Sequence, residues 1–338
     1  MNESAAAPLT VWAISDGAAG NARQAVALAR ALTPDARAFE IGLRGPWRWL
    51  APRLTAGARL GTRGASALRF PWPDIAIGCG RQAALVTRLL RTWSAGTTFT
   101  AQILDPRVDP ALFDVVVAPR HDQVSGPNIL TTSGALHPVD DAWLAQAAAD
   151  FPMLQRLPPP RTALLVGGPR PGLALDAAWL DTLIAHLQAW LARENGSLLI
   201  TASRRTPPEW IDRLRGAFRN GCAYLWSGPQ DGANPYPGYL AHAERFVVTP
   251  DSVNMLSEAC ATGKPVFTLL PRGAHGKLVA FHEALRERGN LRALDADNST
   301  FIPAPPLRET ADVAAEILRR FHARVSGAVP AGEGLSAT

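Results

Sequence analysis

The segment RFVVTPDSVNMLSEACATGKPVFTLLP, residues 245–271, leaves little freedom in how the chain can fold. Its first five residues form a mostly apolar run that closes at Pro250 and predicts a short buried strand. Asp251 or Ser252 is then a favourable helix N-cap, apolar residues recur at helical spacing, and Gly263 is a helix stop. A second apolar run, PVFTLL, follows at once. The segment therefore predicts a strand–helix–strand unit, the building block of parallel sheets.

The start of this helix is also a candidate ligand site. A helix N-terminus that follows a strand offers free backbone N–H groups and a positive dipole, which favour a phosphate or another anion. Ser252 and Asn254 lie at this end of the expected helix, and Glu258 lies one turn further in, where a carboxylate can accept from a pair of ribose hydroxyls. The alternative interpretation is a solvated polar helix face.

The same alternation of apolar runs and amphipathic helices continues through the whole chain. It predicts two Rossmann-like, doubly wound α/β domains with mostly parallel sheets that face each other across a cleft. The proline-rich run FPMLQRLPPP is typical of a linker. We therefore expect one domain over residues 1–155, a second over 156–325, and a disordered tail over 326–338.

Composition narrows the class of protein. A chain of 338 residues with 47% hydrophobic and 19% charged residues suits a soluble globular protein. The net charge of +5 comes almost entirely from arginine, but without a basic run it does not indicate nucleic-acid binding. Cys79, Cys222 and Cys260 lack metal-ligand spacing, so we expect reduced, buried thiols and no metal site. The start MNESAAAPLT does not resemble a signal peptide and no apolar run could span a bilayer, which predicts a cytoplasmic protein.

The segment Arg44–Trp72 differs in character, because it interleaves six arginines with tryptophan, leucine and phenylalanine. We favour an amphipathic helix that packs on its own domain with its arginines in water. The alternative is contact with a membrane surface, for which basic and aromatic residues on one helix are typical. That alternative would place the protein peripherally at the inner membrane.

Two further turns in the second half are expected on the same rim as the start of the 252–260 helix. The GGP turn places Gly167 and Gly168 directly after a strand, where small residues let backbone N–H groups approach a phosphate. The SRR turn after the next strand supplies Ser203, Arg204 and Arg205, and an arginine can bind phosphate oxygens bidentately. Most Gly-Gly turns are only turns, and most arginine pairs are surface residues. Three such turns at the carboxyl ends of one sheet nevertheless favour a nucleotide site.

In the first half, the run SDGAAGN places Asp16 and Gly17 at the end of the first strand, with Asn21 and Gln24 opening the next helix. Asp16 is a candidate general base for an acceptor hydroxyl in the expected cleft. Equally, it could only cap the helix. His121, in the run PRHD after a later strand, is a weaker candidate. The sequence contains no Walker loop, zinc pattern, nucleophile elbow or G-x-G-x-x-G, so ATPase, hydrolase and dehydrogenase functions have little support.

Several of these runs together resemble one family, that of the plant elongated-mitochondria fission factor and its bacterial relatives. They are WAISDGAAGNARQAVALARAL, FDVVVAPRHD, GPNILTTSGALH, LLVGGP, TASRRTP and NPYPGYLAHAERFVVTPDSVNMLSEACATGKPVF. The resemblance covers residues 11–294 and implies the GT-B glycosyltransferase fold. It also implies that Gly167 and Gly168 meet the diphosphate of a nucleotide sugar, that Ser252 lies near the phosphates and that Glu258 meets the ribose. Arg204 or Arg205 would be a further phosphate ligand.

The resemblance thus implies a metal-independent glycosyltransferase that needs no cofactor and transfers a sugar to an envelope glycolipid. The first domain would bind the acceptor and the second the nucleotide. The chain lacks the glycine-rich, histidine-ending first loop of the peptidoglycan glucosaminyltransferase, so Asp16 is only a candidate base. Two other functions fit the same scaffold. One is a non-catalytic adaptor that binds a protein partner at a membrane, and the other is a nucleotide-sugar epimerase, which would need no acceptor.

Overall fold

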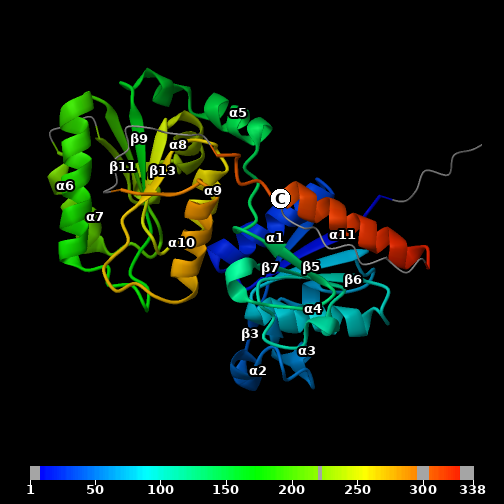
Figure 1. The fold of residues 1–338 in the computed structure, drawn as a ribbon. Helices are drawn as coiled ribbons and strands as arrows, with labels where there is room; N and C mark the ends of the chain where they lie inside the picture. The colour runs from blue at the N-terminus through cyan, green and yellow to red at the C-terminus, as the bar shows by residue number, and fades with distance from the viewer. Residues whose placement is uncertain (1–7, 220–222, 295–303, 328–338) are drawn as a thin grey trace, which may run out of the picture. The chain divides into compact units, whose positions relative to one another are not determined.

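The computed structural model of the chain describes residues 8–219, 223–294 and 304–327. These residues form two compact units (Figure 1). Unit 1 contains the described residues up to Thr132, the short piece Leu136–Pro138 and the described residues from Glu309 onward. Unit 2 contains Ser133–Ala135 and the described residues within Val139–Arg308. Unit 2 is therefore inserted into the chain of unit 1.

This division differs from the boundary expected at residue 155. The last helix, α11 (Thr310–Val325), packs against α1 (Ala19–Leu32) and so belongs to unit 1, although it follows unit 2 in the chain. Periodicity reveals that a helix forms at 309–324, but not which sheet it covers. Of the expected tail, residues 328–338 lie outside the described residues, as does Cys222.

The proline-rich run does not separate the units. Helix α5 (Asp141–Asp150) and the 3-10 helix η4 (Pro152–Arg156) both pack against α8 (Tyr236–His242) within unit 2. The apolar side chains of Leu154 and Phe151 anchor this region in the core of unit 2. The prolines therefore shape a packed turn, because their neighbours bury apolar surface there.

Unit 1 is built on one six-stranded sheet in which every pairing is parallel. In spatial order its strands are β2 (Arg37–Glu40), β1 (Val11–Ser15), β5 (Ile75–Cys79), β6 (Phe99–Ile103), β7 (Val115–Pro119) and β8 (Ile129–Thr132). Alternate residues of β1 face opposite sides: Ala13 packs in the layer with α1 and α11, whereas Ile14 packs in the layer with α4 (Arg81–Trp93). Both faces are covered, which is why the strands read as continuous apolar runs.

The segment between β2 and β5 is not one amphipathic helix, so the helix predicted over Arg44–Trp72 is wrong. It contains two short helices, a single antiparallel strand pair and a 3-10 turn: α2 (Gly45–Leu50), α3 (Ala58–Gly61), β3 (Gly42–Leu43), β4 (Thr62–Arg63) and η1 (Ala65–Ala67). Gly57 and Gly64 adopt left-handed φ values of 65° and 83°. Such backbone ends a helix and costs a glycine little, so the segment cannot continue as one helix.

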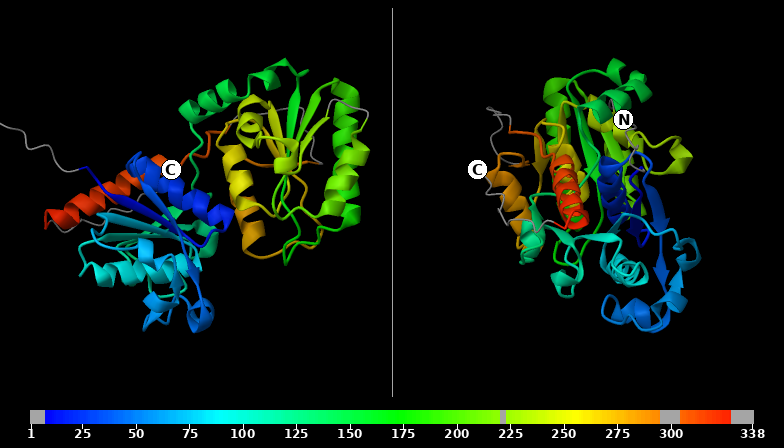
Figure 2. Two further views of the ribbon diagram at one scale, coloured as in Figure 1. Left: turned by 180° about the vertical axis from the view of Figure 1, so that it is seen from behind. Right: turned by 90° about the vertical axis from the view of Figure 1, so that its right-hand side faces the viewer.

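Unit 2 repeats the architecture with a second six-stranded parallel sheet. In spatial order its strands are β11 (Ala223–Trp226), β10 (Ser197–Ala202), β9 (Arg161–Val166), β12 (Arg245–Val248), β13 (Val266–Thr268) and β14 (Arg292–Ala293). Its helices are α5, α6 (Ala177–Glu194), α7 (Pro208–Ala217), α8, α9 (Val253–Cys260) and α10 (Lys277–Glu287). Figures 1 and 2 show helices on both faces of each sheet, so the predicted α/β class and doubly wound winding are confirmed.

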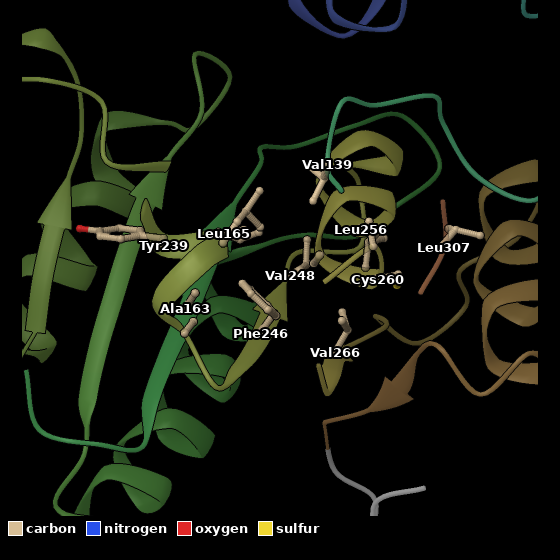
Figure 3. Packing of buried hydrophobic residues seen from close by; sticks show 14 of the residues in the cluster. Val139, Ala163, Leu165, Tyr239, Phe246, Val248, Leu256, Cys260, Val266 and Leu307 are labelled. Atoms are coloured by element: carbon tan, nitrogen blue, oxygen red, sulfur yellow. The ribbon is translucent and has the colours of Figure 1, made fainter. Parts of the chain in front are cut away.

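The strand–helix–strand unit predicted from residues 245–271 is present as β12, α9 and β13. Ser252 is the N-cap, since its side chain accepts from the N–H of Met255 at 3.4 Å. Gly263 has a φ of +71° just beyond the helix. Leu256 and Cys260 on α9 pack with Phe246 of β12 in the core of unit 2 (Figure 3). The apolar stripe of α9 thus faces the sheet, and its first turn is left at the carboxyl end of β12.

Candidate functional site

A doubly wound sheet binds ligands at the carboxyl ends of its strands, beside the point where the strand order reverses. In unit 2 the chain places β10 and β11 on one side of β9 and then β12 on the other side. The reversal therefore lies between β9 and β12. The turns that follow β9, β10 and β12 are those whose residues the sequence singled out.

The glycine turn after β9 is held from the β12 side. The N–H of Gly167 donates to Thr249 Oγ1 at 2.8 Å, and the N–H of Gly168 donates to Asp251 Oδ2 at 3.0 Å. A Cβ atom on Gly167 would lie 2.2 Å from the Asp251 carboxylate, and one on Gly168 would lie 2.1 Å from the carbonyl oxygen of Arg205. Both positions therefore need glycine for close packing of the three turns.

The centre of this arrangement is the carboxylate of Asp251, whose side chain is fully buried. Besides the N–H of Gly168, it accepts from Thr249 Oγ1 at 2.6 Å and from Arg205 Nη2 at 2.6 Å. Hydrogen bonds to an ionised carboxylate are about twice as strong as neutral ones. The two glycine N–H groups expected to meet a diphosphate are thus engaged by Thr249 and Asp251 within unit 2. From the sequence, Asp251 is predicted only as a possible helix N-cap. Its position at the carboxyl end of β12 is the signal that places it on this rim.

The first turn of α9 still offers hydrogen-bond donors. Helix geometry leaves the first N–H groups without partners inside the helix. Among the described residues, the backbone N–H groups of Val253 and Asn254 donate to no other group. Arg170 is exposed and donates to the backbone carbonyl of Asp251 at 3.1 Å, and the side chain of Arg205 is 49% exposed. Two guanidinium groups and a helix N-terminus therefore meet at the strand reversal.

The remaining residues of the arginine turn have local roles. Ser203 Oγ lies 3.1 Å from Thr206 Oγ1 and accepts from the N–H of Arg205 at 3.2 Å, so it shapes its own turn. Thr206 also donates to the carbonyl of Val166 at 3.0 Å, which ties the turn to the end of β9. Arg204 is exposed to solvent. Of the SRR residues, it is Arg205 whose side chain joins the Asp251 cluster.

Glu258 lies on α9 but not at the solvent-facing end of the site. Its side chain is buried and accepts a hydrogen bond from the hydroxyl of Tyr236 on α8. Burying a carboxylate is costly unless hydrogen bonds compensate, which explains why a tyrosine accompanies it. Asn254, one turn earlier, is half-buried. The Tyr236 hydroxyl thus occupies one oxygen of the carboxylate that was expected to meet a ribose.

In unit 1 the strand order reverses between β1 and β5, where Asp16 and Gly17 follow β1. Asp16 Oδ1 accepts from the N–H of Ala18 at 3.2 Å and from Asn21 Nδ2 at 3.0 Å. The carboxylate therefore organises the first turn of α1, although it remains half-buried rather than covered. Burial, and to a lesser degree the nearby Asp16, raises the pKa of the Cys79 thiol, which stays protonated.

Two other candidates in unit 1 are Gln24 and His121. Gln24 is buried, and its Oε1 accepts from the N–H of Leu136 at 3.3 Å, so it fixes a connecting segment. His121 lies in η3 (Arg120–Asp122), directly after β7. β7 is three strand positions from β1, so the strand ends are about 14 Å apart. This spacing places His121 out of hydrogen-bonding reach of Asp16.

Cys79 and Cys260 are free and buried, as predicted.

No ion-binding cluster or membrane span is found within the residues that the structure describes. In that part of the chain, no three His, Cys, Asp or Glu side chains are grouped so as to hold a metal ion. No described helix combines the length and apolarity needed to traverse a bilayer.

Comparison with known proteins shows which family the chain belongs to. The family model described as Mitochondrial fission ELM1 matches residues 19–321. The chain belongs to the mitochondrial fission ELM1 family. The Arabidopsis thaliana mitochondrial fission protein ELM1 is 34% identical over 280 residues, which are 75% of this chain and 65% of that protein. The chain thus matches just under two thirds of the Arabidopsis protein. An uncharacterized protein of Rickettsia prowazekii is 23% identical over 302 residues, which are 78% of this chain and 84% of that protein.

Solved structures with the same fold include enzymes of nucleotide sugars. The UDP-GlcNAc 2-epimerase of Methanocaldococcus jannaschii has a TM-score of 0.52 at 15% identity, covering 92% of this chain and 98% of that one. MnaA of S. aureus, in a structure with UDP, has a TM-score of 0.52 at 12% identity, covering 97% and 93%. At such low identity these likenesses concern the fold alone. Together with the two parallel sheets, they show that this ELM1-family chain has a GT-B-like fold.

Proposed function

We propose that this ELM1-family chain is a GT-B-type glycosyltransferase that binds the diphosphate of a nucleotide sugar in unit 2, between the ends of β9 and β12. One observation carries the proposal: the open N-terminus of α9 meets Arg170 and Arg205 at the strand reversal. Backbone N–H groups at a helix N-terminus and guanidinium groups are both suited to phosphate oxygens. Held in place before the reaction, they stabilise the negative charge of the departing diphosphate.

The other residues have subordinate roles in this proposal. Ser252, Asn254 and Arg204 border the phosphates, whereas Gly167 and Gly168 supply room for the turn rather than N–H donors. Glu258 takes the ribose once the Tyr236 hydroxyl is displaced. The solved neighbours with TM-scores of 0.50 to 0.52 include a UDP-GlcNAc 2-epimerase with UDP-GlcNAc and UDP, and MnaA with UDP, which supports a nucleotide ligand.

The acceptor side of the reaction belongs to unit 1 in this proposal. The Asp16 carboxylate would take the proton of an acceptor hydroxyl, with His121 as the weaker candidate. Its hydrogen bonds to Ala18 and Asn21 hold the carboxylate in a fixed orientation, which a general base requires. The proposed acceptor is an envelope glycolipid.

Calorimetric titration of the purified chain with a panel of nucleoside diphosphates tests the proposal. We expect binding of at least one of them, weakened about tenfold or more by Arg205→Gln, because a hydrogen bond to a charged group contributes about 1.5–3 kcal/mol. Arg193→Gln is the matched control, since Arg193 is an exposed arginine of unit 2 at the far end of α6. If no nucleoside diphosphate binds, the proposal fails.

A second candidate function is a non-catalytic adaptor on the same scaffold. The specific observation in its favour is the Asp251 carboxylate, which already occupies the glycine turn. The Arabidopsis relative carries the name of a mitochondrial fission protein, which is compatible with such a role. An adaptor would bind none of the nucleotides, and Asp16→Asn would leave its biological function intact. An epimerase would be distinguished from a transferase by its product, because the product would form from the nucleotide sugar without any acceptor.

A further inference from the structure

The segment between Glu40 and Asp74 carries charge of one sign only. Over these 33 residues the chain has no Asp or Glu, and it has six arginines: Arg44, Arg48, Arg53, Arg59, Arg63 and Arg69. All six are exposed. Within the described part of the chain, none of them forms an ion pair, although Arg59 stacks over the ring of Trp93 at 5.1 Å. The segment therefore presents uncompensated positive charge to solvent.

The same segment carries large apolar side chains that are not buried. Leu60 is 89% exposed, Phe70 78%, Trp49 75% and Leu50 52%. Trp49 and Leu50 lie on α2 and Leu60 on α3, and these two helices are in contact. Figures 1 and 2 show α2 and α3 together at one end of unit 1. Trp49, Leu50 and Leu60 are thus grouped on two contacting helices, and exposed apolar side chains grouped in this way mark interaction sites rather than ordinary surface.

The backbone under these side chains is held firmly. Arg81 of α4 donates to three backbone carbonyls of the segment, those of Arg48, Trp49 and Ala51. Trp47 donates from Nε1 to the carbonyl of Ala56 at 2.8 Å, and its ring packs against Gly61. Arg88, a second arginine of α4, donates to the carbonyl of Pro52. These bonds hold the backbone of residues 48–52 against α4.

We infer that this arginine–tryptophan segment docks unit 1 on an anionic lipid surface. The indole of Trp49 and the side chains of Leu60 and Phe70 enter the boundary between headgroups and acyl chains, and the arginines pair with headgroup phosphates. Tryptophan together with cationic residues is typical of the membrane interface.

A lipid surface fits these features better than the other polyanions. Single-stranded nucleic acid could stack its bases on Trp49 and Phe70, but it offers nothing apolar for Leu50 and Leu60. An anionic bilayer supplies both partners, because its negatively charged headgroups lie directly above an apolar layer. The inference concerns unit 1 alone, and it is tested without nucleotide. Its failure would leave the proposed nucleotide site untouched.

Co-sedimentation of the full chain with lipid vesicles tests the inference. We expect binding to vesicles that contain phosphatidylglycerol, much weaker binding to phosphatidylcholine alone, and release as salt is raised. The triple variant Arg44→Gln, Arg48→Gln, Arg69→Gln should bind on the order of 100-fold more weakly, at about fivefold per arginine. Its charge-matched control is a second triple variant at exposed arginines of unit 2: Arg156→Gln, Arg193→Gln and Arg219→Gln.

The insertion of apolar side chains into the bilayer is tested separately from the attraction of the arginines to the headgroups. The variant Trp49→Ser, Leu60→Ser, Phe70→Ser keeps all six arginines and should bind on the order of 100-fold more weakly, because three apolar side chains no longer leave water. Met153→Ser is its control, since Met153 is 70% exposed on unit 2. All these side chains are exposed, so the melting temperatures should stay unchanged. The inference is overturned if wild type ignores anionic vesicles, if the controls lose binding equally, or if the apolar variant binds like wild type. Preference for an oligonucleotide over the vesicles would also overturn it.

Discussion

Replacing Asp251 by asparagine removes one negative charge from the strand reversal of unit 2 and changes almost no volume. The carboxylate accepts from the N–H of Gly168, from Thr249 Oγ1 and from Arg205 Nη2. The amide oxygen of asparagine can replace Oδ2 and keep the bonds from Gly168 and Arg205 in weaker, uncharged form. The amide NH₂ then faces Thr249, whose hydroxyl proton loses its acceptor.

The stability of Asp251→Asn should fall as a result. One buried hydroxyl loses its partner and two charge-assisted bonds become neutral, which together amount to about 2–3 kcal/mol. The ion pair with Arg205 contributes only a small part of this free energy, because its half-exposed guanidinium is screened by water. Urea unfolding should therefore show the free energy of unfolding lowered by about 2–3 kcal/mol, with an unchanged m-value.

The affinity for a nucleoside diphosphate should move in the opposite direction. In the proposed site the Asp251 carboxylate competes with the phosphates for Arg205. For charges roughly 6 Å apart at an effective dielectric constant between about 20 and 80, the repulsion removed is about 0.7–3 kcal/mol. Calorimetry should thus give binding of UDP, or of the best diphosphate in the panel, on the order of tenfold tighter in Asp251→Asn.

The combination of lower stability and tighter binding is the signature of an internal carboxylate that competes with a ligand. Asp212→Asn is the control, because this carboxylate is exposed on α7 and pairs with an arginine of the same helix. It should change neither quantity appreciably. If Asp251→Asn lowers stability but leaves nucleotide affinity unchanged or weaker, the carboxylate does not compete with the phosphates and the reasoning is refuted.

Two further predictions concern residues around this site. Burial lowers the pKa of His282 to about 4, below its unfolded value of about 6.5, so the folded state binds fewer protons. Stability is then fully present above pH 6.5 and falls by about 3 kcal/mol as the pH drops towards 4; urea titrations should show this slope, and His282→Gln should flatten it between pH 6.5 and 4.5. Gly168→Ala should destabilise the fold by about 1–3 kcal/mol, because the new methyl group meets the carbonyl of Arg205. Gly216→Ala, where the added Cβ meets no atom within 4 Å, should stabilise α7 by up to about 1 kcal/mol; thermal unfolding of both variants compares them, and equal effects would contradict the packing argument.

Much of the fold was predictable, because it depends on local periodicity. Continuous apolar runs identified strands such as β9 and β12, and Ser252 and Gly263 marked the limits of α9. Segments without one dominant period were predicted poorly. In residues 44–72, glycines in left-handed conformations divide the chain, and whether a glycine adopts positive φ depends on tertiary packing. The assignment of α11 to unit 1 depends on a contact with α1 that spans nearly the whole chain.

The candidate site was predictable as a set of turns but not as a network. Strand ends and turn residues placed Gly167, Gly168 and Arg205 on one rim, and the structure brings all three together. The position of Asp251 after β12 places it on the same rim, but the inward direction of its side chain, which accepts from the N–H of Gly168, was not foreseeable. That outcome depends on side-chain direction at the first turn of a helix, which a one-dimensional pattern does not encode. The Tyr236 hydroxyl on Glu258 was missed for the same reason.

The insertion of unit 2 into unit 1 has a consequence for biosynthesis. Phe321 on α11 packs edge-on against Phe99 of β6, at 6.0 Å between ring centroids, and Ile317 is fully buried in the same core. A chain emerging from the ribosome exposes one face of the first sheet until these residues are made. Unit 2, which is nearly continuous in sequence, can complete its core earlier. A released chain that ends at Arg308 should therefore protect unit 2 from protease while unit 1 stays susceptible, which reverses the usual N-terminal-first order of domain folding.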